Sequence, residues 1–253
     1  MISERHLAQG FSAFWQELLP LLTPRFVRLF NEGYVKQVHD HHTFEIEPLP
    51  VGIENDHPAI VAEMAFFLAQ ISHQRSISIS DACMSHEICT SAANRAIRLV
   101  EEYEGKKPES KVELSEREMT EAIEVAVRYD FLYLEFQKDD QIEFSPRVPG
   151  TGFIPSCCGD ISIGQTLLEV KTVNRNLSGK DIRQLIIYLA LQASTGQRRW
   201  PSAGFFNPRR GIMAEFTVDP ILFRLSGGKT ASQVFDELVA FASTRDVHFE
   251  SAF

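Results

Sequence analysis

The sequence predicts an α/β protein in which helices flank a mixed β-sheet, preceded by a mainly helical N-terminal region. Two observations lead to this fold class. After residue 109 the expected elements follow the order helix, strand, strand, strand, helix, strand, and before it apolar residues recur at helical spacing. The chain has 253 residues, of which 44% are hydrophobic and 23% are charged, as in ordinary globular proteins.

In the N-terminal region, apolar spacing predicts helices over residues 4–31, 58–73 and 80–104. Pro20 and Pro24 would split the first segment into two short pieces. Pro58 would be the first residue of the second helix, and Ser80 would cap the third. Between the first two helices, residues 34–50 have the pattern of a hairpin or of two short strands.

A polar segment that contains Gly and Pro, residues 102–111, is the expected boundary between residues 1–108 and residues 109–253. Beyond it, a helix over 115–134 begins with the capping-box pattern Ser115-x-x-Glu118. The other expected elements are strands over 142–148, 160–163, 166–173, 202–207 and 212–218, a helix that begins at Ser178 or Gly179, and a final helix over 230–243.

Three charged side chains stand out in the apolar strands on either side of Gly164-Gln165. Glycine followed by one residue suits a two-residue type II′ turn, because glycine accepts positive φ at its first position. Counting outward from that turn, Asp160 faces Glu169, and directly paired residues point to the same side of a sheet. Lys171 is two residues beyond Glu169 and shares that side. All three charges are therefore expected in one patch.

Two carboxylates opposite each other destabilise a hairpin and resist joint ionisation. A divalent cation between them removes both objections, and two carboxylates with waters and a substrate phosphate are a usual Mg²⁺ arrangement. A solvent-facing strand whose lysine bridges two acids is the alternative that the hairpin alone leaves open.

The net charge of −9 argues against a protein coated in nucleic acid, but the charge is unevenly distributed. Residues 171–210 contain eight Lys or Arg residues and one acid, so this segment is +7 and the rest of the chain is −16. A basic block directly after an acidic hairpin suits a phosphodiester substrate. The residues expected to contact nucleic acid are Lys180, Arg183, Arg209 and Arg210. A solvated surface of mixed charge is the alternative.

No apolar run approaches the roughly 20 residues that span a bilayer, and the N-terminus has no apolar signal core. A cytoplasmic protein without membrane contact is expected, with reduced cysteines. Two further clusters, residues 39–42 with three histidines and Cys83-x-x-His86-x-x-Cys89, are expected to be a solvated loop and core thiols rather than metal sites.

The succession Asp160, Glu169-Val170-Lys171 and Gln184-x-x-x-Tyr188 resembles the PD-(D/E)XK nuclease superfamily. It is most similar to the branch with a Gln-x-x-x-Tyr helix, found in exonucleases and in prokaryotic DNA-processing and antiviral defence nucleases. The resemblance covers residues 113–220, with Gly159 where relatives often have proline. It implies a restriction-endonuclease-like core and a nuclease that uses Mg²⁺ or Mn²⁺.

The resemblance also implies a role for each motif residue. Asp160 and Glu169 would be metal ligands, with the Val170 carbonyl completing the coordination. Lys171 would position or help to deprotonate the attacking water and stabilise the pentavalent phosphate.

Gln184 and Tyr188 are four residues apart, so they share a helix face that would meet the active site or the nucleic-acid backbone. A core aromatic is the alternative for Tyr188. The family often adds a glutamate from the first core helix, which would be Glu118 or Glu121 here, although Glu118 is also placed to cap its helix.

The expected function is metal-dependent hydrolysis of phosphodiester bonds, in DNA rather than RNA. The acidic remainder of the chain favours a protein partner or a homo-oligomer, as in a subunit of a DNA-processing or defence complex. Two alternatives stay open. One is a subunit with the nuclease fold that binds nucleic acid or a partner without cutting, and the other is RNA as the substrate.

Overall fold

The structure is a computed structural model that describes residues 2–49, 56–104, 112–136 and 140–244. The helices are α1 (Glu4–Gln9), α2 (Ser12–Leu18), α3 (Pro24–Gly33), α4 (Pro58–Arg75), α5 (Ile79–Met84), α6 (His86–Glu104), α7 (Glu116–Val127), α8 (Tyr129–Leu134), α9 (Gly179–Ala193), α10 (Val218–Leu225) and α11 (Ala231–Ser243). The strands are β1 (Val35–Gln37), β2 (Ile142–Phe144), β3 (Arg147–Val148), β4 (Cys157–Cys158), β5 (Ile161–Ile163), β6 (Thr166–Val170), β7 (Ser202–Asn207) and β8 (Ile212–Thr217).

Among the described residues, the main sheet has six strands in the order β1-β8-β7-β6-β5-β2. β6 and β7 run parallel, and the other neighbours are antiparallel. A separate pair, β3 and β4, forms a small second sheet. The predicted α/β class with a mixed sheet and flanking helices is therefore confirmed.

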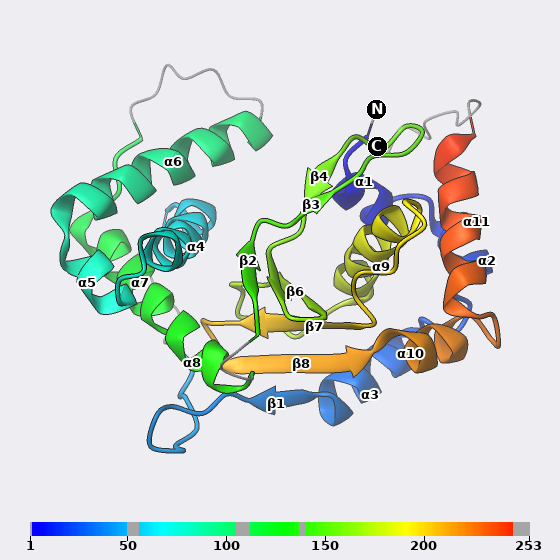
Figure 1. Ribbon diagram of the computed structural model, residues 1–253, viewed down its shortest axis with the longest axis horizontal. Helices are drawn as coiled ribbons and strands as arrows, with labels where there is room; N and C mark the ends of the chain where they lie inside the picture. The colour runs from blue at the N-terminus through cyan, green and yellow to red at the C-terminus, as the bar shows by residue number, and fades with distance from the viewer. Residues whose placement is uncertain (1, 50–55, 105–111, 137–139, 245–253) are drawn as a thin grey trace.

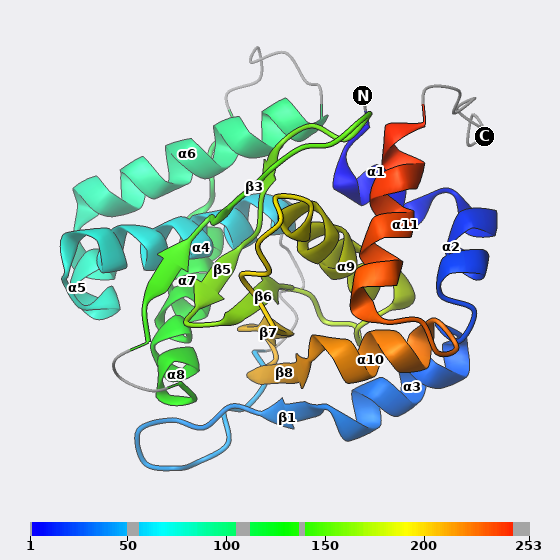
Figure 2. The ribbon, with the colours of Figure 1, turned by 45° about the vertical axis from the view of Figure 1, so that its right-hand side comes forward.

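Helices cover both faces of the main sheet. Figure 1 shows α4, α5, α6 and α7 on one side of it and α1, α2, α9 and α11 on the other, and Figure 2 gives the same arrangement from a second direction. Leu167 and Leu168 are both fully buried, but they belong to different core clusters, one on each face. This double burial explains why β6 has apolar residues at successive positions instead of an alternating pattern.

The N-terminal region is mainly helical, as expected, but it is part of the same packed structure as the rest of the chain. Val35 of β1 pairs with Ala214 of β8, α1 packs against α9, and α4 packs against α7. Residues 1–108 and 109–253 therefore share one sheet and both core clusters. Residues 105–111, most of the expected boundary segment, lie outside the described residues.

Several expected helices are divided. The segment over 80–104 is two helices, because Ser85 adopts an extended backbone, and the cap is Ser78 rather than Ser80. The Ser78 hydroxyl accepts a hydrogen bond from the Asp81 N–H at 3.0 Å. The first segment breaks at Gly10 as well as at the prolines, and the next residue, Phe11, has a left-handed φ of 55°.

Two other differences concern short helices. The segment over 115–134 is α7 and α8, divided at Arg128, and its predicted capping box is present. α10 has no counterpart among the expected elements. Within the described residues, no helix is long and apolar enough to cross a membrane.

Candidate active site

The acidic hairpin has the register that its turn predicts. Ile163 pairs with Thr166, Ser162 with Leu167, and Ile161 with Leu168. Gly164 has a φ of 54°, the sign that the first position of a type II′ turn requires. Asp160 lies one residue before β5, and Glu169 lies within β6, so the hairpin brings the two acids to the same end of the sheet.

Asp160, Glu169 and Lys171 form a compact charged group in the structure. One Asp160 oxygen, Oδ2, accepts a hydrogen bond from the Val170 N–H at 2.7 Å. The Lys171 ammonium donates to Glu169 Oε1 at 2.7 Å. Glu169 is only 2% exposed, and its second oxygen, Oε2, is buried with no hydrogen-bond partner among the described residues. The carboxylate therefore has one unused acceptor in a place where an unpaired polar atom is costly.

The ionisation of this group depends on its burial and on the neighbouring charges. Burial and the neighbouring Glu169 carboxylate hold the pKa of Asp160 well above its usual 3.8, although Lys171 and the Val170 N–H act in the opposite direction. Burial alone would lower the pKa of Lys171, but Glu169 and Asp160 raise it above 10.5. Lys171 is therefore cationic at neutral pH, whereas burial and the Glu169 charge disfavour ionisation of Asp160.

Gln184 and Tyr188 connect to this group through side-chain hydrogen bonds. Lys171 Nζ donates to Gln184 Oε1 at 2.9 Å, and Gln184 Nε2 donates to the Tyr188 hydroxyl at 2.9 Å. The Tyr188 hydroxyl donates to Glu4 Oε1 at 3.3 Å. The Tyr188 ring is part of the hydrophobic core, while its hydroxyl belongs to a series of hydrogen bonds that runs from Lys171 through Gln184 to Glu4.

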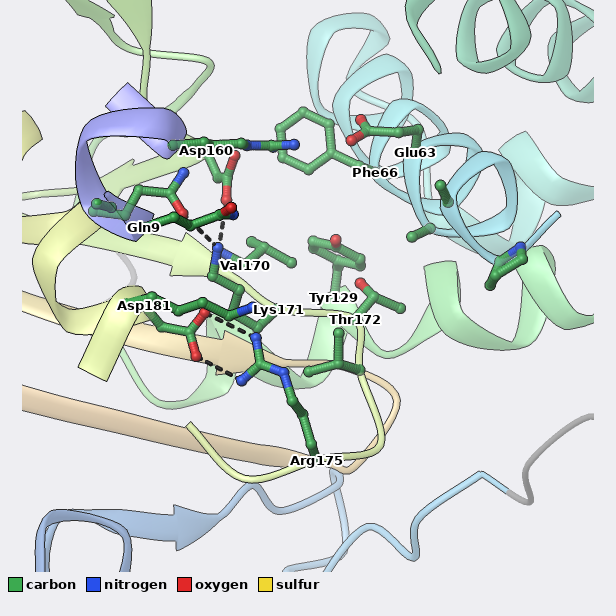
Figure 3. A pocket seen from close by; sticks show the side chains of 18 residues that line it. Gln9, Glu63, Phe66, Tyr129, Asp160, Val170, Lys171, Thr172, Arg175 and Asp181 are labelled. Carbon is green, nitrogen blue, oxygen red and sulfur yellow. Dashed lines mark hydrogen bonds and ion pairs between the residues drawn. The ribbon is translucent and has the colours of Figure 1, made fainter. Parts of the chain in front are cut away.

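A cleft of about 450 Å³ opens above the charged group. Asp160, Val170 and Lys171 lie on one side of it and Glu63 of α4 on the other (Figure 3). Burial raises the pKa of Glu63, and Glu169 adds to the rise while Arg5 opposes it. Glu63 was not predicted from the sequence. The available signal was a lone acid within the otherwise apolar run PAIVAEMAFF.

Arg5 of α1 is a second residue of the cleft that the sequence did not point out. Its guanidinium lies 5.2 Å from the centre of the Tyr103 ring, which belongs to α6 and is 63% exposed. It also lies 3.9 Å from Glu4. Burial lowers the pKa of Arg5, but Tyr188, Glu169 and Asp160 raise it by more than burial lowers it. The pKa of Arg5 is therefore higher than its ordinary value. A guanidinium is thus held close to the two acids.

The two glutamates proposed from the first core helix are not at the cleft. Glu118 forms the capping box with Ser115 and accepts hydrogen bonds from the His57 N–H and ring at 3.0 Å. Glu121 pairs with Arg209. Neither lines the cleft. The structure therefore does not bring these two residues to the cleft, because their carboxylates serve a helix cap and an ion pair, and Glu63 is the helical glutamate that faces Asp160.

The residues proposed to contact nucleic acid lie in different environments. Arg209 is 5% exposed and pairs with Glu121, so its guanidinium is buried in an ion pair away from the cleft. Arg183 lies partly buried over the Trp15 ring at 5.5 Å and donates to the Ala8 carbonyl at 3.4 Å. Arg210 donates to Asn176 Oδ1 at 2.7 Å. Lys180 is exposed and lines the cleft.

Other members of the basic block are also paired, Arg175 with the one acid of the block and two more arginines with acids outside it. Arg175 binds Asp181 at 2.6 and 2.9 Å, Arg198 binds Asp219 at 2.8 Å, and Arg199 pairs with Glu143. The positive charge counted along residues 171–210 is therefore largely neutralised in space. Of the four basic residues proposed to contact nucleic acid, Lys180 alone lines the cleft.

The described residues contain no group of three or more His, Cys, Asp or Glu side chains arranged to hold a metal ion. Cys83 and Cys89 are free thiols, as expected of a reduced core. Two carboxylates are nevertheless sufficient for Mg²⁺ when waters and a substrate phosphate supply the other oxygens. Asp160 and the unpartnered oxygen of Glu169 fit that requirement.

No protein-family model matches the chain, and no curated protein is significantly similar to it in sequence.

Proposed function

We propose that the chain is a metal-dependent nuclease that hydrolyses phosphodiester bonds in DNA, built on a restriction-endonuclease-like core. The single observation that supports this most strongly is the position of Lys171. Its ammonium is held by Glu169 and Gln184 beside Asp160, at a cleft. An ammonium fixed next to two carboxylates with an unused acceptor is suited to a reaction in which negative charge develops on a phosphate.

Asp160, Glu169 and the Val170 carbonyl would hold Mg²⁺ or Mn²⁺, with Glu63 facing them across the cleft. When bound, such a cation lowers the pKa of a coordinated water and neutralises phosphate charge.

The residues of the chain account for the remaining requirements of the reaction. Lys171 donates hydrogen bonds only, so it orients a water oxygen or stabilises an oxyanion at its own position. Gln184 and Glu169 fix the direction of the ammonium. Arg5 and Lys180 at the cleft supply the positive charge that a phosphate backbone requires.

The test is incubation of the purified protein with labelled linear DNA, circular DNA and RNA, with Mg²⁺, with Mn²⁺ and in EDTA. We expect cleavage of DNA that requires the cation, and a loss of about 100-fold or more in Lys171→Ala, as for other groups that stabilise transition-state charge. The matched control is Lys229→Ala, which removes a lysine from a surface ion pair with Glu237. Equal rates in both variants would contradict the assignment.

The same experiment separates the alternatives. Binding of nucleic acid without cleavage under any condition would support the non-cleaving subunit, and cleavage of RNA alone would change the substrate. Metal binding is measured independently by thermal unfolding. A cation at 100 times its Kd stabilises a folded protein by about 2.7 kcal/mol. We expect this shift in the wild type and in Lys229→Ala, and its absence in Glu169→Gln.

A further inference from the structure

Glu4 is a buried carboxylate at the far end of the hydrogen-bond chain that begins at Lys171. It belongs to the first turn of α1 and contacts Tyr188, a residue 184 positions later in the sequence. We propose that Glu4 is a positioning residue that sets the direction of this chain and thereby holds the Lys171 ammonium in place. The proposal rests on the catalytic role proposed for Lys171.

The donor-to-acceptor direction of this series of hydrogen bonds follows from which groups can donate a proton and which can only accept one. An ammonium only donates, so Gln184 must present its carbonyl oxygen to Lys171. The amide nitrogen of Gln184 then faces Tyr188 and donates to the hydroxyl oxygen. The Tyr188 proton must therefore go to another acceptor, and the carboxylate of Glu4 accepts it. With Glu4 Oε1 as the acceptor of the Tyr188 proton, every group in the series has a partner and the donor-to-acceptor direction runs from Lys171 to Glu4.

Without the Glu4 carboxylate, the Tyr188 proton has no acceptor in this direction, and the hydrogen bond between Tyr188 and Gln184 reverses. The Tyr188 hydroxyl would donate its proton to Gln184, and the amide would turn to offer its oxygen. Its nitrogen would then face Lys171, which places two donors against each other. Lys171 would retain Glu169 as its partner and lose Gln184.

The attachment of α1 does not require this carboxylate. Leu7 and Ala8 of the same helix are buried in the core, and the Trp15 ring nitrogen donates to the Leu7 carbonyl at 2.8 Å. The Ser3 side chain caps the helix. Because apolar contacts and a cap already fix α1, a buried acid at position 4 has a more specific explanation in its bond to Tyr188.

The test first compares four single variants. Glu4→Leu removes the acceptor, Glu4→Gln keeps an acceptor oxygen and the shape, and Tyr188→Phe removes the middle of the chain. Glu17→Gln is the matched control, because it neutralises an exposed glutamate in the neighbouring helix α2.

The first readout is hydrogen exchange of the Gln184 side-chain NH₂ in the metal-free protein, measured by NMR and assigned from its absence in Gln184→Glu. Buried, bonded protons exchange slowly, so we expect exchange at least about tenfold faster in Glu4→Leu and Tyr188→Phe. Glu17→Gln should behave as the wild type, and Glu4→Gln, whose amide donates as well as accepts, should exchange at a rate between those of the wild type and Glu4→Leu. Unchanged exchange in Glu4→Leu would overturn the proposal. If that variant does not fold, unchanged exchange in Tyr188→Phe overturns it equally.

The second readout is DNA cleavage. Loss of a group that orients a catalytic partner typically reduces activity by about tenfold or more, so Glu4→Leu should lower kcat by that factor with KM unchanged. Because both variants interrupt one chain, the double variant Glu4→Leu/Tyr188→Phe should be no slower than Tyr188→Phe alone. If the loss of kcat in the double variant equals the product of the losses in the two single variants, the two residues act independently and the proposal is refuted. A wild type that cleaves no nucleic acid would refute the nuclease function, while the exchange data would still decide the role of Glu4.

Discussion

Lys171→Met tests the charged group most directly, because it removes the ammonium and keeps a long side chain. The Lys171 side chain is 14% exposed and that of its partner Glu169 is 2% exposed, so the pair is shielded from water. Removing one partner of a buried ion pair costs about 3–5 kcal/mol, since the other charge remains buried. Each kcal/mol shifts Tm by about 2–4 °C in a chain of this size, so the metal-free variant should melt on the order of 10 °C lower.

The pH dependence of this loss has a definite sign. The pKa of Lys171 is raised in the folded protein above its ordinary 10.5, because the neighbouring acids outweigh the effect of burial. The stability that the ammonium contributes is therefore complete below pH 10.5 and declines as the pH rises through the raised value. The titration of the ammonium itself should accordingly add no pH dependence to the difference between wild type and variant near neutral pH.

The assay is thermal unfolding followed by circular dichroism, in EDTA and in MnCl₂. Mn²⁺ should restore part of the lost stability in Lys171→Met, because a cation at Glu169 replaces the missing positive charge. Lys229→Met is the control, since exposed ion pairs contribute about 0–1 kcal/mol. If Lys171→Met melts within 2 °C of the wild type in EDTA, a threshold of about 1 kcal/mol, the buried ion pair does not have the role assigned to it.

Three further predictions concern single residues. Asp160→Asn should melt higher than the metal-free wild type at pH values above the raised pKa of Asp160, and the difference should shrink as the pH falls through that pKa, because protonation relieves the same repulsion. Melting curves across pH would show the opposite trend if the acid were not strained. Gly164→Ala should lower the free energy of unfolding in urea by about 1–2 kcal/mol, because φ at this position is 54°, and an unchanged value would mean that the turn tolerates a side chain. Lys180→Gln should reduce the slope of log affinity for DNA against log salt concentration, measured in Ca²⁺, by about 0.9. Arg209→Gln should leave this slope unchanged and lower Tm, and the reverse result would assign the phosphate contact to Arg209.

The features that sequence patterns predicted correctly are those set by near neighbours. The register of the hairpin follows from Gly164 and the period-two alternation of side chains, and the structure has that register. The capping box at Ser115 is likewise encoded within four residues. The Gln184-x-x-x-Tyr188 spacing predicted a shared helix face, and the two side chains are bonded to each other.

The features that were missed depend on partners that lie far apart in the sequence. The basic block was counted along the chain, but Arg209 is neutralised by Glu121, 88 positions earlier. The same separation concealed Glu63 and Glu4, since nothing local to α4 or α1 indicates that either helix lies against the acidic hairpin. The first core helix lies where it was expected, but its Glu118 and Glu121 have partners of their own and do not line the cleft.

The contact between α1 and α9 also sets the order in which the molecule is completed in the cell. Ribosomes add about 5–20 residues per second, so the first helix emerges roughly 10 to 40 s before Tyr188, which lies 184 residues later. β1 can pair with β8 only after still more of the chain has been synthesised, because Val35 pairs with Ala214. Such distant contacts make folding slow and leave early segments exposed to chaperones and proteases. A nascent chain that stops before α9 therefore carries the acids of the hairpin without Gln184, the residue of α9 that accepts a hydrogen bond from Lys171.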